Sequence, residues 1–531
     1  YAGKENTLDW VQGNLQETRL LLEQIYNKWF PEVIYFQHSK GFDGPRQVLL
    51  TQIPETASMP PRLVNQLENF SAHLGRELGR QNLTGVVKQV PKSWGSEFSV
   101  GQFWRHNIIA ITSEMAPTRM ATALYYPIGS LTGGELRPPA SELTANWHGG
   151  WWRLRNIIDY EVATITAVLE HTAQRKEAIV YDFCKMNMDG IAQGRDRPPF
   201  AFVVPHRQSD RVAIVQMLKM LARAGIEIHS ADEDFWADGQ EYSKGDFVIS
   251  LAQPFRAYIT DLLEQQQEDE QDFADGWLFA RAKDTGSLNL PQMMGVDVVR
   301  IEEPFDANLI KFDQTASVKS RISGTHGDYV IRNQNNQIAP FINRLLKENR
   351  KVFWLKNSLE IEGRLYQAGS VYVPEKEIKK VAMADLEQQL ALEIDRIQQS
   401  FKGQPAYRLR RARLGLFQPW TSNIDEGWTR LVLEKFEFSY RTIYNAKILN
   451  GRLRGDFDAI IIPDMTSNEI VNGLRVLRPD IYTPRLPRSY RGGIGSSGVD
   501  NLREFVNKGG TLIVLNNACD LISEQFGLPI E

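Results

Sequence analysis

Two residues that follow buried-strand patterns could do chemistry together. His38 ends the apolar run EVIYFQ at 32–37, and Glu114 follows the run NIIAIT at 107–112. In open α/β sheets, side chains at the carboxyl ends of strands meet at one edge, where ligands gather. A neutral imidazole can bind zinc, and a carboxylate beside a metal-bound water can take its proton. Metal-assisted hydrolysis is therefore one interpretation of the pattern; position alone favours the alternative, that each residue is only a hydrogen-bonded strand end.

Three other segments carry residues that could belong to a binding site or a catalytic site. Arg46, in GFDGPR at 41–46, could place a cation near His38, although a surface ion pair is the alternative role. The segment RGGIGSSG at 491–498 could present backbone N–H groups to an anion, but it lacks the lysine of a phosphate-binding loop. Cys519 follows a strand pattern, where a nucleophile could lie, but no histidine follows it in the chain. We expect this thiol to be unreactive.

The elements that must position these residues alternate along the first third of the chain. A helical stripe at 14–29 precedes the strand pattern at 32–37. A second helix is expected at 63–78, before the strand at 107–112, and a long helix at 155–175. Alternation of helices and strands is typical of α/β domains, so we expect a mainly parallel sheet here.

Three further regions are expected after this domain. Residues 197–300 should form a small α/β accessory domain. Residues 301–408 should form a β-rich accessory region plus one long polar helix at 375–399. Residues 409–531 again alternate strands with helices, which predicts a second doubly wound α/β domain.

The composition agrees with a multi-domain globular protein. The 531 residues correspond to about three or four domains, and 42% hydrophobic and 24% charged residues are ordinary values. The formal charge of −4 gives no electrostatic reason to expect nucleic acid as a partner. The two cysteines, Cys184 and Cys519, exclude a disulfide framework and a cysteine-rich zinc ribbon. No apolar run reaches the length of about 18 residues that a membrane span needs.

Four segments resemble the zinc carboxypeptidases, the carboxypeptidase A-like metallopeptidases with an α/β fold. YFQHSKG resembles the strand that ends in the last zinc-binding histidine, and ITSEMA resembles the strand that ends in the catalytic glutamate. The interval of 76 residues between His38 and Glu114 is also close to the family's interval. ENTLDW resembles a substrate-binding segment, and HGGWWRLR resembles a subgroup of large, multi-domain bacterial members.

The resemblance implies a mixed sheet with helices over residues 1–175, a zinc ion, and hydrolysis of peptide bonds in a peptide or protein substrate. It makes His38 a zinc ligand, Glu114 the general base and acid, and Asn6 a substrate-binding residue. Arg46 is the candidate for a second substrate-binding residue. Large members of the family are generally exported, so the resemblance also implies a periplasmic or secreted location.

Two departures from the family's pattern qualify these expectations. The family's first two zinc ligands form a His-x-x-Glu motif upstream of ENTLDW, so we expect an amino-terminal part of the domain to be missing. Catalytic zinc needs three protein ligands, so zinc binding is expected only with the upstream pair. Leu8 stands where the family has a substrate-binding arginine. The alternative function is therefore a non-catalytic peptide-binding or scaffold protein derived from a peptidase.

The last region resembles the class I glutamine amidotransferase-like domains. FDAIIIPD at 457–464 resembles their central strand, and GGTLIVLNNACD at 509–520 resembles their nucleophile strand and turn. Cys519 is displaced by one or two residues from the position of the nucleophile. The resemblance implies a flavodoxin/amidotransferase-like fold and a non-catalytic accessory role.

Overall fold

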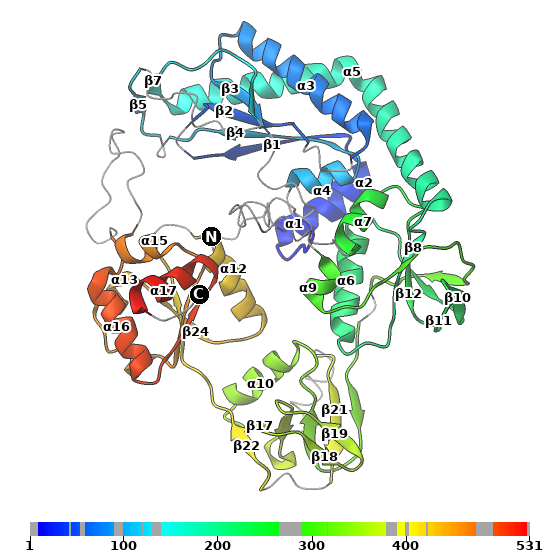
Figure 1. Cartoon of the computed structure of the whole chain (residues 1–531), viewed down its shortest axis with the longest axis vertical. Helices are drawn as coiled ribbons and strands as arrows, with labels where there is room; N and C mark the ends of the chain where they lie inside the picture. Colours follow the sequence, from blue (N-terminus) through cyan, green and yellow to red (C-terminus); the bar gives the residue numbers. More distant parts are fainter. Residues whose placement is uncertain are drawn as a thin grey trace. The chain divides into compact units, whose positions relative to one another are not determined.

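The computed structural model describes residues 9–41, 44–53, 59–89, 99–118, 121–128, 140–264, 289–315, 317–378, 390–398, 403–420, 423–473 and 492–527. These residues form a mixed α/β structure (Figure 1). They divide into two compact units, with the boundary between residues 315 and 317. No helix in these ranges is both long and apolar enough to cross a membrane.

The first unit begins with a five-stranded sheet that carries His38 and Glu114. Its order is β1-β4-β2-β3-β6. The strands are β1 (Val33–Ser39), β4 (Ile109–Met115), β2 (Gln47–Leu50), β3 (Val86–Gln89) and β6 (Ala140–Glu142). The pairs β1/β4 and β2/β3 are parallel, whereas β2/β4 and β3/β6 are antiparallel. The sheet is therefore mixed, as the resemblance implies. The expectation of a mainly parallel sheet, which came from the alternation of helices and strands, was wrong, because β2 runs antiparallel to β4.

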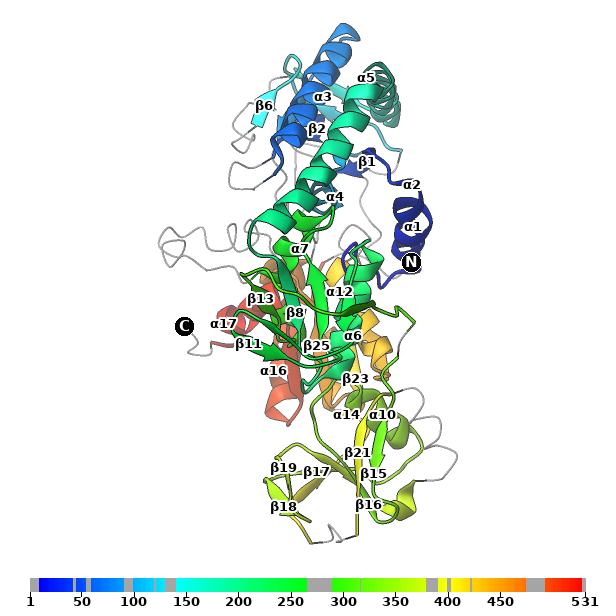
Figure 2. The same ribbon diagram turned by 90° about the vertical axis from the view of Figure 1, so that its right-hand side faces the viewer.

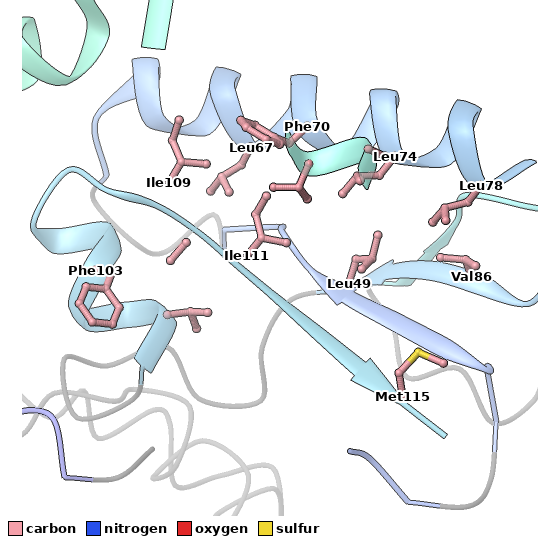
Figure 3. Close-up of a cluster of buried hydrophobic side chains, with 14 of the residues drawn as sticks. Leu49, Leu67, Phe70, Leu74, Leu78, Val86, Phe103, Ile109, Ile111 and Met115 are labelled. Atoms are coloured by element: carbon pink, nitrogen blue, oxygen red, sulfur yellow. The ribbon is translucent and has the colours of Figure 1, made fainter. Parts of the chain in front are cut away.

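One face of this sheet is covered by helices α3 (Pro61–Arg80) and α5 (Leu154–Asp196), which lie side by side (Figures 1 and 2). Apolar residues recur along α3 at helical spacing and point into the core (Figure 3). They are Leu63, Leu67, Phe70, Leu74 and Leu78, each fully or almost fully buried. Leu49, Val86, Ile109 and Ile111 of the sheet belong to the same buried cluster.

Helix α5 has 43 residues, so the end predicted for the first domain, at 175, lies inside it. The amino-terminal segment 14–29 is helical as expected, through α1 (Gln16–Leu21), a π-helical turn η2 (Leu22–Tyr26) and α2 (Asn27–Trp29). The remaining elements of this region are α4 (Ser99–Arg105) and the strand pair β5 (Leu124–Tyr126) and β7 (Gly150–Trp152).

The rest of the first unit is a second, smaller α/β region. Its sheet has the order β13-β8-β12-β9-β14 and every pair in it is antiparallel. The strands are β8 (Ala201–Val204), β9 (His229–Ala231), β12 (Phe247–Ser250), β13 (Val299–Ile301) and β14 (Leu309–Lys311). The other elements are α6 (Arg211–Arg223), β10 (Phe235–Ala237), β11 (Gln240–Tyr242), α7 (Arg256–Leu263) and α9 (Leu290–Met294). The domain boundary predicted at residue 300 falls within this sheet, because β14 pairs with β9.

The second unit begins with a β-rich region, a six-stranded sheet of order β15-β21-β16-β20-β17-β22. The strands are β15 (Arg321–Ser323), β16 (Asp328–Ile331), β17 (Phe353–Leu355), β20 (Val371–Val373), β21 (Glu393–Ile397) and β22 (Ala406–Arg408). Its other elements are α10 (Ile338–Lys347), β18 (Leu359–Ile361), β19 (Arg364–Tyr366) and the 3-10 turn η5 (Glu375–Glu377).

The sequence predicts one long polar helix at 375–399, but the described residues at both ends of this segment do not form an α-helix. Residues 393–397 form strand β21, which lies between β15 and β16 in the sheet. Ile394 and Ile397 are buried there, so pairing on both sides and burial of these side chains outweigh the helical propensity of the segment. Residues 379–389 lie outside the described ranges.

The last region is a parallel sheet with helices, of order β24-β23-β25-β26. The strands are β23 (Leu414–Phe417), β24 (Tyr440–Ile443), β25 (Ala459–Ile462) and β26 (Thr511–Val514). The helices are α12 (Ile424–Lys435), α13 (Asn445–Leu449), α14 (Leu453–Asp456), α15 (Ser467–Asn472), α16 (Gly495–Asn507), η7 (Asn516–Cys519) and α17 (Asp520–Phe526). In chain order this arrangement is 2-1-3-4, the order in which flavodoxin-like sheets begin.

Candidate functional site

His38 and Glu114 lie side by side near the carboxyl ends of β1 and β4. The two strands are parallel, and their register pairs His38 with Glu114. Nδ1 of His38 is 3.8 Å from Oε1 of Glu114. The structure thus brings together, on one edge of one sheet, the two residues that the strand patterns predict to meet there.

The distance between the two groups suits a shared third atom. At 3.8 Å the contact is too long for a direct hydrogen bond, but a small ion or a water molecule can contact both groups. The side chain of His38 is 37% exposed and that of Glu114 is 23% exposed. The pair is therefore partly open to solvent and accessible to a ligand.

An aromatic cluster lies next to the pair on the same face of the sheet. Side chains alternate along a strand, so Phe36 points to the same side as His38. The ring of Phe36 stacks on Phe103 of α4 at 5.7 Å between centroids and meets Trp10 at 6.2 Å. Trp10 and Phe103 are almost completely buried. This packing fixes the strand that carries His38.

On the opposite face, a single carboxylate of α5 joins the two strands that carry the pair. Glu161 accepts hydrogen bonds from Tyr35 (2.6 Å) and Gln37 (2.9 Å) of β1, and from Ser113 (2.8 Å) of β4. Gln37 and Ser113 are the residues immediately before His38 and Glu114. Glu161 therefore ties β1 and β4 together at the level of the candidate site.

A buried amide extends this network to the third strand. Nε2 of Gln47 in β2 donates to Ser113 Oγ (2.8 Å) and to Thr164 Oγ1 of α5 (2.9 Å), and all three residues are buried. Burial, together with the adjacent Glu161 carboxylate, raises the pKa of Tyr35. The phenol is thus a protonated donor at any physiological pH. Nothing in the local sequence distinguished Glu161 from other acidic residues of the helix.

The two side chains are of types that suit a zinc site, but they are fewer than the protein ligands that such a site needs. An imidazole and a carboxylate are donors that zinc accepts, and a catalytic zinc needs three protein ligands. Within the ranges that the structure describes, no group of three or more His, Cys, Asp or Glu side chains could hold a metal ion. His38 can supply one ligand, and the others would have to come from outside these ranges.

Arg46 occupies a different environment from the one expected. Its side chain is fully buried, with the guanidinium 4.5 Å from the ring centroid of Tyr126, 4.6 Å from that of Trp147 and 5.3 Å from that of Trp152. It also donates to the carbonyl of Gly44 at 2.7 Å. A guanidinium enclosed by three rings stabilises the fold, so the prediction that Arg46 reaches a substrate does not agree with its position.

The ENTLDW segment is described only at its end. Asn6 and Leu8 lie outside the described residues, so the prediction for Asn6 remains a prediction. Asp9 is fully buried, and its carboxylate accepts hydrogen bonds from the backbone N–H groups of Asn14 (2.8 Å) and Leu15 (2.7 Å). This part of the segment stabilises the turn before α1.

Two other histidine pairs were not anticipated. His73 of α3 and His171 of α5 are both 7% exposed, with ring centroids 4.7 Å apart. Burial, then the neighbouring His73, lower the pKa of His171 to about 4. In the smaller α/β region, Nδ1 of His206 is 2.7 Å from the buried Asp246. Both pairs join separate elements, and such proximity has no local signature in the sequence.

The cysteine of the last region lies at the end of the turn that follows its strand, not at the position with positive φ. Asn516, two residues after β26, has a positive φ of 49° and donates to Asp464 at 2.7 Å. Cys519 ends the 3-10 turn η7 and is exposed. The strained turn position therefore holds an amide rather than a thiol. Gly495, in the glycine-rich segment, begins α16, while Arg491 lies outside the described residues.

No family model, curated protein or solved structure matches this chain.

Proposed function

We propose that the His38–Glu114 pair is part of a zinc-dependent site that hydrolyses peptide bonds in the manner of the zinc carboxypeptidases. The observation that carries the proposal is the register pairing of these residues, with Nδ1 and Oε1 3.8 Å apart at one sheet edge. Residues outside the described ranges must supply the remaining metal ligands, because His38 supplies only one.

In this proposal the two residues have different tasks. Zinc, when bound, would polarise the scissile carbonyl and lower the pKa of a water molecule. His38 holds one coordination position. Glu114 accepts the proton of the attacking water and later donates it to the leaving amine, which is the task of a general base and acid. The partial exposure of both side chains leaves room for a peptide.

A matched set of variants tests the proposal. In a chain that includes the upstream His-x-x-Glu pair, we expect zinc and hydrolysis of peptides from a panel with free carboxyl termini. Glu114→Gln should retain zinc and lose hydrolysis by about 10²–10⁴-fold, because only the proton transfer is removed. His38→Ala should lose zinc, because a ligand is removed. Glu177→Gln, an exposed change on α5, is the control and should behave as the wild type.

A second function is favoured by one observation, the incomplete set of metal ligands in the described residues. In that case the protein would be a non-catalytic peptide-binding or scaffold protein derived from a peptidase. It would bind peptides without zinc and without turnover, and Glu114→Gln would leave binding unchanged. Equal hydrolysis by the wild type and both site variants would contradict the peptidase proposal.

The region at 409–531 enters the proposal as a class I glutamine amidotransferase-like accessory domain. The parallel strand order and the turn after β26 support that likeness. Asn516 at the turn and the exposed position of Cys519 favour a non-catalytic role.

A further inference from the structure

The amino-terminal edge of the parallel sheet in the last region is rich in arginine. Arg413 directly precedes β23, Asp458 directly precedes β25, and Arg441 is the second residue of β24. These three strands are parallel neighbours, so their amino ends lie side by side. Asn516 and Cys519 follow the carboxyl end of β26, at the opposite edge. The arginine-rich edge is therefore separate from the amidotransferase-like turn.

Three of these arginines share the carboxylate of Asp458. Nε and Nη2 of Arg413 donate to it at 3.1 and 2.9 Å, and Nη1 of Arg454 donates to it at 2.9 Å. Arg410 approaches the same carboxylate to 3.8 Å. The hydrogen bonds from Arg413, and then those from Arg454, hold the pKa of Asp458 well below its usual range. This carboxylate therefore stays charged, and three guanidinium groups surround it.

A second carboxylate, that of Asp456, has a similar environment. Nη2 of Arg441 donates to the backbone carbonyl of Asp456 at 2.7 Å and lies 3.9 Å from its carboxylate. Lys447 forms an ion pair with the same carboxylate. Arg411 donates to Ser439, at the start of β24, at 2.5 Å. We use the name basic patch for six residues: Arg410, Arg411, Arg413, Arg441, Lys447 and Arg454.

The basic patch has more positive charge than its surroundings neutralise. Its six cations face two carboxylates, which leaves an excess of four positive charges. Arg452, which is exposed, adds one more. Other charges beside the patch occur in pairs of opposite sign, which are Arg344 with Glu437, Lys508 with Glu504, and the chain neighbours Glu434 and Lys435. Charges of one sign repel each other, and a partner of opposite charge relieves that repulsion.

The chemistry of the patch favours carboxylates on a short peptide. Its guanidinium groups already bind one carboxylate through charge-assisted hydrogen bonds, and Arg410 and Arg441 are 77% and 60% exposed, so both can contact a second molecule. The formal charge of the whole chain is −4, so the chain outside the patch is net negative. Duplex nucleic acid or an anionic membrane would extend beyond the patch onto these negatively charged parts and be repelled. A short acidic segment would contact the patch alone.

We propose that the basic patch is a docking site for a short acidic peptide segment of a partner protein. The inference is independent of the proposed hydrolysis, because neither His38 nor Glu114 belongs to the patch. It gives the last region, whose turn carries no thiol, a role in recruiting that partner.

Fluorescence anisotropy with the whole chain tests the docking site. The probe is a short labelled peptide of Glu and Asp with an amidated carboxyl terminus, and the same peptide made of Gln and Asn is its control. The wild type should bind the acidic probe and not the neutral one. The affinity should fall as salt is added, because the charges of the patch are exposed and are screened.

Paired variants locate the binding. Arg410→Gln with Arg441→Gln should weaken binding of the probe by about five- to tenfold, because two exposed cations are removed. Arg80→Gln with Arg155→Gln removes the same charge from side chains that are 76% and 78% exposed in the first unit, and it should leave the affinity unchanged. Thermal melts establish that each variant is folded, and Arg410→Gln alone is the milder second variant.

A wild type that does not bind the acidic probe at low salt overturns the proposal, and so does binding that is indifferent to the paired patch variant. Tighter binding of a duplex oligonucleotide or of phosphatidylserine vesicles than of the probe overturns the choice of an acidic peptide as the partner. Glu114→Gln should bind the probe as the wild type does, so a failure of the proposed hydrolysis leaves this test unaffected.

Discussion

Ser113 donates a hydrogen bond of 2.8 Å to Glu161, and the next residue in the strand is Glu114. The side chains of Ser113 and Glu114 point to opposite faces of the sheet, because neighbours along a strand alternate. A carboxylate of the covering helix α5 thus holds the backbone of β4 one residue away from the candidate general base. Through Tyr35 and Gln37, the same carboxylate also holds β1 beside His38.

Glu161→Leu should weaken the fold and disturb the site together. The donors of Tyr35, Gln37 and Ser113 would lose their common acceptor, at a cost of about 1–3 kcal/mol for a donor that stays buried. Urea unfolding measures the loss of stability. Zinc content and hydrolysis per folded molecule should also fall, as the spacing of β1 and β4 relaxes. Glu177→Gln, exposed on the same helix, should change neither quantity; equal behaviour of the two variants would contradict a positioning role.

Arg46→Lys should destabilise the protein by about 1–3 kcal/mol, although it keeps the charge. The buried ring cage suits a flat guanidinium, and an ammonium at the same place loses stacking and is poorly solvated. Urea unfolding checks this, with Arg80→Lys as the control, because the Arg80 side chain is 76% exposed. Peptide binding per folded molecule should stay unchanged. A selective loss of peptide affinity would instead support the original expectation for Arg46.

Gly194→Ala should be strongly destabilising, by about 3 kcal/mol or more. A methyl group at Gly194 of α5 would overlap the backbone carbonyl oxygen of Leu251, which cannot move away cheaply. Gly79 of α3 is the matched control, since nothing lies within 4 Å of a methyl group added there. Gly79→Ala should stabilise the protein by about 0.5–1 kcal/mol through helix propensity. Equal effects in urea unfolding would refute the close approach of α5 to residue 251.

The stability of the protein should fall on mild acidification because of His171. Its pKa is about 4 in the folded state, lowered by burial and then by His73, Arg175 and Arg76, whereas an unfolded histidine titrates near ~6.5. Between these values the unfolded chain binds more protons, so this contribution is complete above about pH 6.5 and is lost as the pH falls towards 4. The total is about 3 kcal/mol at most.

The measurement is urea unfolding as a function of pH. In His171→Gln the free energy of unfolding should change less with pH between about 6.5 and 4, since the titrating ring is gone. His148→Gln replaces an exposed histidine and should leave the slope as it is. If the free energy of unfolding of His171→Gln depended on pH as in the wild type, other groups would be responsible for the loss of stability in acid.

The sequence by itself determined where the two candidate residues stand. The runs EVIYFQ and NIIAIT are short, apolar and rich in β-branched and aromatic residues, a composition typical of strands. In the structure β4 is buried, whereas β1, at the end of the sheet order, is partly exposed. His38 and Glu114 follow those runs, so each could be placed near the end of a strand. That β1 and β4 are neighbours could not be derived from chain order, because the two strands are not consecutive in the chain. The alternation of strands and helices in the last region could likewise be predicted, because the hydrophobic period of each strand and helix is a property of its local sequence.

The tertiary structure alone decided the surroundings of the pair. It placed Glu161 beneath both strands, enclosed Arg46 among aromatic rings, set β2 antiparallel to β4 and drew residues 393–397 into a sheet. Each of these depends on contacts between residues far apart in the chain, as with the 48 positions that separate Ser113 from Glu161. Local periodicity tells which way a side chain faces, but the partner that it meets is set by long-range packing.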